Sequence, residues 1–509
     1  MSLSPPVRTH LATRWVVALC LLKIAIHLPL AHRYGYHGDE LYFILCGQHP
    51  ALGYVDHPPM VPWIAGLCDL LFGQSIVALR IPAILAGTLT VALSMETARL
   101  LGGKTYAQVL AGLTTIFAPI YLLACGMLNI PVVETLFWTL SSYFLLRAIV
   151  LDESRAWLLV GVVSGLGLLT KHSLLLWGAG IAVGLVLTPA RKHLRTPWPW
   201  LGGTIAFVIF LPNLIWQATH DWATLEFITG LSSTRPPDYA EFILSQWIYA
   251  GALALFVWIG AIIFLFTQRG ANARPIAWMF MIAFVLLTVL NGKTYYLAPS
   301  FATVFACGGV AWEGWLSPKR KTLRGLSLTA VVVGGLIFAP IVVPVWPIEE
   351  ADRYVTTIFG DLAKPTDFTA ELHRQHGKRE NTARIAELFQ QIPESERTST
   401  IVLNGAYSQA STINYLGKEL GLPTAYAGHM TFYFWGPPPS SATSALAYGI
   451  PAETLEGLFE SVTQHGVVGG PPTMPVEHNI PVYYCKNLRR PWTEVWPTLK
   501  TFNHRVPYD

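Results

Sequence analysis

The sequence predicts a polytopic α-helical membrane protein with a soluble α/β domain at its C-terminal end. Of its 509 residues, 52% are hydrophobic and only 13% are charged, which is too apolar for an ordinary soluble enzyme. Long apolar segments recur from Trp15 to Val345, and the composition becomes more polar after that point. The net charge of +4 says little by itself, and we expect no nucleic-acid partner.

About eleven apolar segments are long enough to cross ~30 Å of hydrocarbon. The first lacks a small-residue cleavage site, so we interpret it as an uncleaved anchor and not as a signal peptide. The segments lie near 13–31, 76–100, 105–123, 131–150, 156–170, 173–189, 199–218, 244–267, 275–290, 295–316 and 325–346.

The distribution of Lys and Arg among the connecting loops predicts the orientation. If the N-terminus lies inside, nearly all loop cations lie on the inner side. The first loop (32–75) and the residues after 346 then lie outside, on the periplasmic face of a bacterial inner membrane. The outer loops that connect the membrane segments carry only four cations, which are Arg33, Lys171, Arg235 and Lys293.

Residues 347–509 have the pattern of a small α/β domain, separate from a membrane domain over 1–346. Thr400–Asn404 has strand character, and a helical stretch, Ser408–Leu420, follows it. Strands that alternate with helices favour this fold class. The shorter strand candidates are Thr424–Ala427, Ala445–Gly449, Ser461–Val468 and Val482–Lys486.

The first loop concentrates ionisable residues beside the bilayer, where an unpaired charge is costly. We expect helices over 39–49 and 60–72, with a turn at Pro58-Pro59 between them. Adjacent side chains on a helix point ~100° apart, so Asp39 and Glu40 would face different partners. One could act as a general base on a hydroxyl while the other binds a cation or orients a loop. Alternatively, Asp39 simply caps the helix.

Asp56 and His57 precede the two prolines, so Asp56 could be only a turn residue; its place in the same loop as Asp39 favours a functional role. Glu134 lies in an apolar helix, where a carboxylate is a functional candidate, although it could also reach the interface.

Four cationic or polar groups could bind an anion such as a phosphate, or could anchor the chain to anionic headgroups. They are Lys171, His172, Arg235 and Lys293, the last beside Tyr295. His429 lies in an aromatic stretch (422–439) that could stack on a sugar or form the buried underside of the C-terminal domain. We therefore expect all of these residues to contact substrate.

Several motifs resemble the bacterial family 39 glycosyltransferases, which are dolichyl-phosphate-mannose–protein mannosyltransferase-like proteins with the GT-C fold. The matching pieces are YGYHGDELYFILCGQHPALGYVDHPP (34–59), ETLFW (134–138), GLGLLTKHS (165–173), GKTYYLAPSF (292–301), NYLGKELGLPTAYAGH (414–429) and FWGPP (434–438).

The resemblance implies transfer of a sugar, with inversion, from a polyprenyl-phosphate donor to a lipid, glycan or protein hydroxyl on the extracytoplasmic face. The family's catalytic base in the first external loop maps to Asp39, with Glu40 beside it. A second acid maps to Glu134, with Asn129 as a rival. A divalent metal ion is compatible with the family and not required, and Asp39, Glu40 and Glu134 would be its ligands.

Two other classes stay open at this point. A secondary transporter or a flippase of lipid-linked glycans would need charges near the bilayer midplane and broken helices in matched halves. A binding protein for lipid-linked glycans that has lost activity would keep the same motifs.

Overall fold

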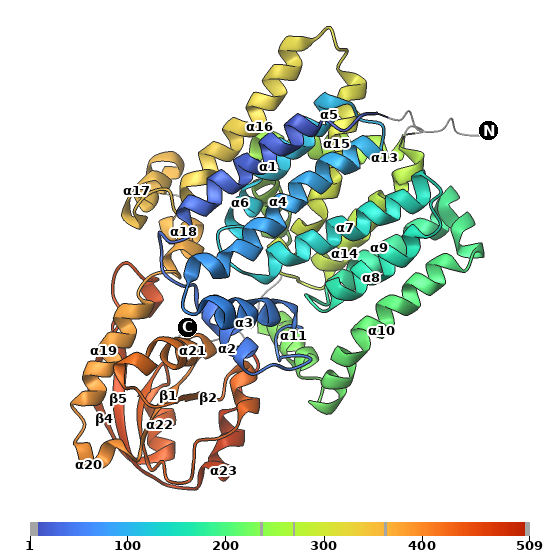
Figure 1. Ribbon diagram of the computed structural model, residues 1–509. Helices are drawn as coiled ribbons and strands as arrows, with labels where there is room; N and C mark the ends of the chain where they lie inside the picture. Colours follow the sequence, from blue (N-terminus) through green and yellow to red (C-terminus); the bar gives the residue numbers. More distant parts are fainter. Residues whose placement is uncertain (1–8, 235–237, 268–269, 361–363, 504–509) are drawn as a thin grey trace. The chain divides into compact units, whose positions relative to one another are not determined.

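The computed structural model describes residues 9–234, 238–267, 270–360 and 364–503 (Figure 1). Its internal contacts divide the chain into two compact units. The helical unit comprises Met1–Ala31, Val77–Trp216 and Arg235–Val345, and the mixed unit comprises His32–Ile76, Gln217–Thr234 and Trp346–Asp509. The predicted division into domains 1–346 and 347–509 stays a prediction.

Most helices of the helical unit run roughly side by side in Figure 1. They are α1 (Thr13–His27), α4 (Ile76–Leu100), α5 (Thr105–Phe117), α6 (Pro119–Ala124), α7 (Ile130–Val150), α8 (Ala156–Leu168), α9 (Leu174–Leu187), α10 (Trp198–Thr219), α12 (Tyr239–Ala250), α13 (Leu255–Phe266), α14 (Arg274–Val289), α15 (Phe301–Trp315) and α16 (Lys321–Val342). A 3-10 segment, η5 (Thr294–Ser300), precedes α15.

The predicted class of a multi-span helical membrane protein is confirmed, but the number of spans is lower than predicted. By length and composition, six helices among the described residues can cross a membrane, or up to eight if each of two bent pairs is one span. The predicted spans are often interrupted. Residues 105–123 break at Ala118, because Pro119 cannot donate a backbone hydrogen bond to continue α5. Residues 295–316 begin as η5, which leaves α15 only 15 residues long.

Small residues let the membrane helices approach closely. A methyl group added at Gly180 of α9 would lie 2.5 Å from the Cα of Met279 in α14, and one added at Gly184 would lie 2.7 Å from the Cα of Pro275. Close backbone approach of this kind is how helices pack where lipid removes the hydrophobic driving force.

The mixed unit contains a five-stranded sheet in the order β2-β1-β3-β5-β4. The strands β1, β2 and β3 are parallel, and β5 pairs antiparallel with β3 and β4. The predicted α/β pattern is therefore confirmed, with each predicted strand present. Their bounds are β1 (Thr400–Asn404), β2 (Ala425–Ala427), β3 (Ser444–Tyr448), β4 (Phe459–Val468) and β5 (Ile480–Leu488).

The mixed unit also contains helices, two of which, α2 and α3, come from the first loop. They are α2 (Gly38–Gln48), α3 (Met60–Phe72), α11 (Ala223–Thr234), α17 (Ile348–Phe359), α18 (Pro365–His373), α19 (Lys378–Gln390), α20 (Glu394–Arg397), α21 (Tyr407–Leu416), α22 (Ala452–Leu458) and α23 (Trp492–Val495). Both helices predicted in the first loop, α2 and α3, are present within one residue of the expected bounds.

The first loop packs against the C-terminal part of the chain. In Figure 1 the blue α2 lies beside the orange α21, and the two helices are in contact. The backbone of Gly38 is so close to α21 that an added methyl group would lie 3.0 Å from the Cβ of Ser408. The Tyr34 hydroxyl also donates to the carbonyl of Trp346 over 2.6 Å. The start of α2 is thus fixed by residues far away in sequence.

Candidate active site

The start of α2 is a capping box that separates the two predicted acids. The N–H of Asp39 donates to Nδ1 of His37 over 3.1 Å, and the N–H of His37 donates to Oε2 of Glu40 over 3.0 Å. This reciprocal pairing satisfies N–H groups that an α-helix leaves without partners. Glu40 is fully buried, whereas the side chain of Asp39 is 42% exposed. The two carboxylates do face different partners, and the carboxylate of Glu40 caps the start of α2.

Asp39 and Asp56 are each held by a tyrosine. The Tyr407 hydroxyl, from the first turn of α21, donates to Oδ1 of Asp39 over 2.7 Å. The Tyr42 hydroxyl of α2 lies 2.9 Å from Oδ1 of Asp56 and 2.7 Å from the hydroxyl of Thr431. The two tyrosine rings contact each other, with centroids 4.4 Å apart. The mixed unit thus brings two predicted site carboxylates into one hydrogen-bonded aromatic cluster.

His57 is buried beside Asp56. Its Nδ1 donates to the carbonyl of Pro58 over 3.0 Å, and its Nε2 lies 3.7 Å from Oδ1 of Asp56. Among the residues that the structure describes, this Nε2 has no hydrogen-bond partner.

A charged pair lies on the other side of His37. Nε2 of His37 is 3.2 Å from Oε2 of Glu371 in α18, and Glu371 also pairs with Arg374. Burial would raise the pKa of Glu371, but the hydrogen bond from His37 and the charge of Arg374 lower it to about 2. Burial would likewise lower the pKa of His37, but Asp39 and Glu371 raise it above its ordinary value.

His429 follows β2 and supports α21. Its Nδ1 accepts the N–H of Tyr407 over 3.2 Å, and its Nε2 donates to the carbonyl of Asn503 over 2.8 Å. Burial lowers the pKa of His429, which favours the neutral ring that these two contacts need. The predicted ligand-binding histidine is therefore engaged on both sides.

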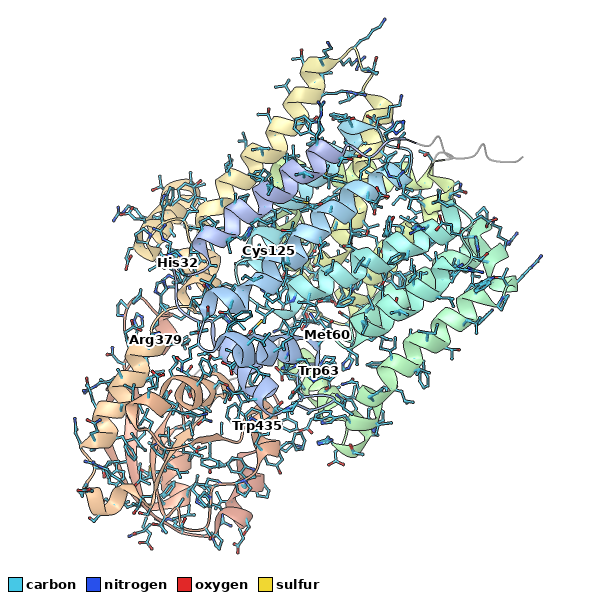
Figure 2. All side chains as sticks on the ribbon, viewed as in Figure 1. His32, Met60, Trp63, Cys125, Arg379 and Trp435 are labelled. Atoms are coloured by element: carbon cyan, nitrogen blue, oxygen red, sulfur yellow. The ribbon has the colours of Figure 1, made fainter. Side chains whose placement is uncertain are left out.

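The aromatic stretch after His429 packs within the mixed unit. The ring of Trp435, labelled in Figure 2, stacks on His49 of the first loop with centroids 4.5 Å apart. Nε1 of Trp496 donates to the carbonyl of Tyr433 over 3.0 Å. Both contacts are made within the mixed unit, and stacking of this stretch on a sugar stays a prediction.

Glu134 lies in the helical unit with a different set of partners. Its side chain is only 2% exposed, and its Oε2 is 3.3 Å from Nζ of Lys171. The hydroxyl of Ser173 donates to its Oε1. The ammonium of Lys171 also lies 3.6 Å from the centroid of the Tyr296 ring and 5.4 Å from that of Tyr295. This arrangement is a buried ion pair that is closed on one side by an aromatic ring.

The other predicted residues that the structure describes in the helical unit lie just before helices. Nε2 of His172 hydrogen-bonds Oδ1 of Asn213 over 2.9 Å. Lys293 precedes η5 as its N-cap residue. Asn129 caps α7 by accepting the N–H of Val132. Helix capping is therefore a structural reason for an asparagine at this position. Arg235 lies outside the described residues.

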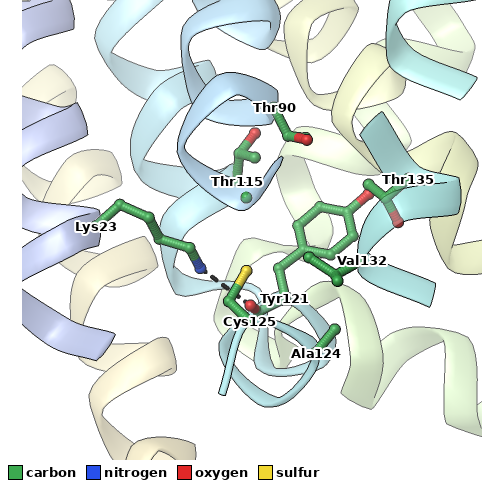
Figure 3. Close-up of a pocket in the computed structure, with 9 residues that line it drawn as sticks. Lys23, Thr90, Thr115, Tyr121, Ala124, Cys125, Val132 and Thr135 are labelled. Atoms are coloured by element: carbon green, nitrogen blue, oxygen red, sulfur yellow. Dashed lines mark hydrogen bonds between the residues drawn. The ribbon is translucent and has the colours of Figure 1, made fainter. Parts of the chain in front are cut away.

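A further polar cluster in the helical unit is absent from the sequence prediction. Lys23 of α1 is fully buried and lines a small cavity with Cys125 and three threonines, shown in Figure 3. Its Nζ donates to the carbonyl of Tyr121 over 3.0 Å, and Nε2 of His27 donates to that of Leu122 over 3.0 Å. Both side chains thus bind carbonyls of the short helix α6. The sequence could have indicated this cluster, because an ionisable residue inside an apolar helix is a functional candidate.

The described residues contain no group of three or more His, Cys, Asp and Glu side chains that could hold a metal ion. Of the three predicted metal ligands, Asp39 and Glu40 belong to the mixed unit and Glu134 to the helical unit. The metal site stays a prediction.

Comparison with known proteins gives a family and two curated relatives. Residues 56–216 match the family described as dolichyl-phosphate-mannose-protein mannosyltransferase. The lipid A galacturonosyltransferase RgtD of Rhizobium johnstonii is 26% identical over 312 residues, which is 59% of this chain and 64% of that protein. The lipopolysaccharide core galacturonosyltransferase RgtA of the same organism is 23% identical over 333 residues, 63% of this chain and 64% of that protein. The chain therefore matches less than two thirds of the length of these relatives.

Solved structures show the same fold over nearly the whole chain. ArnT from Cupriavidus metallidurans bound to undecaprenyl phosphate has a TM-score of 0.64 at 16% identity, over 93% of this chain and 98% of that one. The apo form of ArnT has a TM-score of 0.61 at 17% identity over the same shares. The resemblance predicted from the motifs is thus found in both comparisons: the chain has the fold of ArnT, and its residues 56–216 are similar to the dolichyl-phosphate-mannose-protein mannosyltransferase family.

Proposed function

We propose that this membrane protein is a glycosyltransferase in which Asp39 is the general base. The supporting observation is the state of Asp39 at the start of α2. Its carboxylate is 42% exposed and is hydrogen-bonded by the neutral hydroxyl of Tyr407. The neighbouring Glu40 is buried in the capping box. Of the two adjacent acids, Asp39 is therefore the one that can receive a proton from an incoming hydroxyl.

The comparisons support the substrate classes. The ArnT structure contains undecaprenyl phosphate, and the two curated relatives are named for the transfer of galacturonic acid to lipid A and to the lipopolysaccharide core. We infer a polyprenyl-phosphate sugar as donor and a hydroxyl of lipid A or of the lipopolysaccharide core as acceptor. Galacturonic acid is the first donor sugar to test.

In the proposed reaction the acceptor oxygen attacks the anomeric carbon while Asp39 accepts the hydroxyl proton. The bond between the anomeric carbon and the phosphate oxygen breaks, and the polyprenyl phosphate leaves with the electron pair. One displacement inverts the anomeric centre. Phosphate is already a good leaving group, so the proposal needs no general acid.

The predicted second acid has a different role in this proposal. Because Glu134 is buried and paired with Lys171, we assign the pair to holding α7 against the turn before α9. His172, Arg235 and Lys293 stay predicted contacts of the donor phosphate. The extracytoplasmic location of the first loop also stays part of the proposal, supported by the distribution of loop cations.

The test is sugar transfer by the purified full chain in nanodiscs, with labelled polyprenyl-phosphate galacturonic acid as donor and lipid A as acceptor. We expect Asp39→Asn to lower the rate roughly 10²- to 10⁴-fold, as the loss of a general base does. The matched control is Asp69→Asn, because Asp69 of α3 is also a first-loop carboxylate bound by a tyrosine of α21. Wild-type transfer by Asp39→Asn would refute the assignment.

A further inference from the structure

Two tyrosines of α21 reach the two helices of the first loop in the same way. The Tyr407 hydroxyl donates to Oδ1 of Asp39 in α2 over 2.7 Å, across 368 residues of sequence. The Tyr415 hydroxyl donates to Oδ1 of Asp69 in α3 over 2.6 Å, across 346 residues. The contacts are chemically alike, but only the first involves the proposed base.

Tyr407 is held on several sides, so its hydroxyl has little freedom to move. Its N–H is bound by His429, and its ring contacts His429 and Tyr42 at centroid distances of 5.3 and 4.4 Å. The start of α21 also lies against the start of α2 at Gly38 and Ser408. A donor fixed in this way fixes the carboxylate that accepts from it.

The hydroxyl stays a donor throughout the physiological pH range. Burial, followed by the negative charges of Asp39 and Asp56, raises the pKa of Tyr407 well above its ordinary value. The other charged groups around Asp39 are His37, whose Nδ1 lies 3.8 Å from Oδ2, and the ion pair of Glu371 with Arg374. At 3.8 Å the histidine is too distant for a hydrogen bond, so Oδ2 is not held as Oδ1 is.

We propose that Tyr407 is a positioning residue that binds Oδ1 of Asp39, prevents rotation of the carboxylate and presents Oδ2 to the acceptor hydroxyl. A general base works only within hydrogen-bond reach and in the correct orientation. The C-terminal part of the chain therefore contributes to the chemical step through α21. This inference rests on the proposed function of Asp39.

The test compares Tyr407→Phe with the matched control Tyr415→Phe, in the full chain and in the transfer assay described above. Removing a hydrogen bond to a charged group typically costs about 10- to 100-fold. We expect Tyr407→Phe to lower kcat by that factor and to leave the KM for the donor unchanged. Tyr415→Phe should leave both kcat and the KM for the donor unchanged.

A purely structural role predicts a different result. The two variants would then lose activity in proportion to their loss of thermal stability, and this would overturn the inference. Wild-type kcat in Tyr407→Phe would overturn it as well, while an inactive Asp39→Asn would leave the proposed function standing. Full activity of Asp39→Asn would overturn both.

The contact itself can be tested without substrate. In a double-mutant cycle of Tyr407→Phe and Asp39→Ala, which removes the acceptor, we expect coupling between the two substitutions in thermal unfolding. Additive effects would show that the hydrogen bond is not formed and would overturn the inference.

Discussion

In the sequence, Asp39 and Glu134 are similar candidates for a functional acid, because each lies near the start of a predicted helix at the membrane. Their surroundings differ. Asp39 is 42% exposed and accepts from a neutral hydroxyl. Glu134 is 2% exposed, lies 3.3 Å from the ammonium of Lys171 and accepts from Ser173. A carboxylate that faces solvent can accept and release a proton with little effect on the fold. A buried carboxylate that is paired with a cation stabilises the fold, because its loss leaves the cation unpaired.

The largest expected effect is a separation of activity from stability at these two positions. Asp39→Asn should abolish most transfer and lower stability less than Glu134→Gln does, because the side chain is 42% exposed and an Asn oxygen can still accept from Tyr407. Glu134→Gln should mainly lower stability. Parallel assays of transfer and of thermal unfolding in detergent check this. Equal losses of stability in the two variants would contradict the comparison.

The Glu134–Lys171 pair gives the next largest effect. Removing one member of a buried pair leaves an uncompensated charge and typically costs about 3–5 kcal/mol. We expect Glu134→Gln and Lys171→Met to lower the melting temperature strongly, and the double variant to regain part of the loss. If the double variant lost as much free energy of unfolding as the two single variants lose together, the two charges would not be coupled.

A smaller effect is expected at the ring under Lys171. Tyr296→Leu removes a ring centred 3.6 Å from the ammonium and should cost about 1–2 kcal/mol, the range for a desolvated cation–π contact. Tyr295→Leu is the matched control, because that ring lies 5.4 Å away and its loss should cost less. Thermal unfolding of the two variants measures the difference, and the reverse order would refute the contact.

The smallest effect is a dependence of stability on pH near Asp39. Because the folded pKa of His37 is raised above 6.5, its contribution is complete below pH 6.5 and is lost as the pH rises through the raised value. The folded pKa of Glu371 is lowered from 4.5 to about 2, so its contribution is complete above pH 4.5 and is lost as the pH falls toward 2. Stability from this pair should therefore be greatest between pH 4.5 and 6.5.

Substitution separates the two limbs of that curve. His37→Gln should flatten the decline of the melting temperature above pH 6.5, and Glu371→Gln should flatten the decline below pH 4.5. A curve that neither substitution changes would assign the pH dependence to other groups.

The sequence predicted the fold class, both first-loop helices and all five strands, because each depends on local composition and periodicity. It overestimated the number of spans, since hydropathy does not register a break such as Ala118-Pro119. It grouped Asp39, Asp56 and His57 because they lie in one loop, and their part in a site stays a prediction. It could not find Tyr407, Glu371 or Arg374, which reach the first loop from more than 300 residues away and carry no local signature.

The two tyrosine contacts of α21 have a consequence for how such proteins can be divided or recombined. A fragment that ends at Val345 would lack both hydroxyls that bind α2 and α3, so it would not hold the first loop as the full chain does. Chimeras that exchange C-terminal regions between relatives would have to carry the first loop along with the donor's α21. The natural unit of exchange in this protein is therefore discontinuous in sequence.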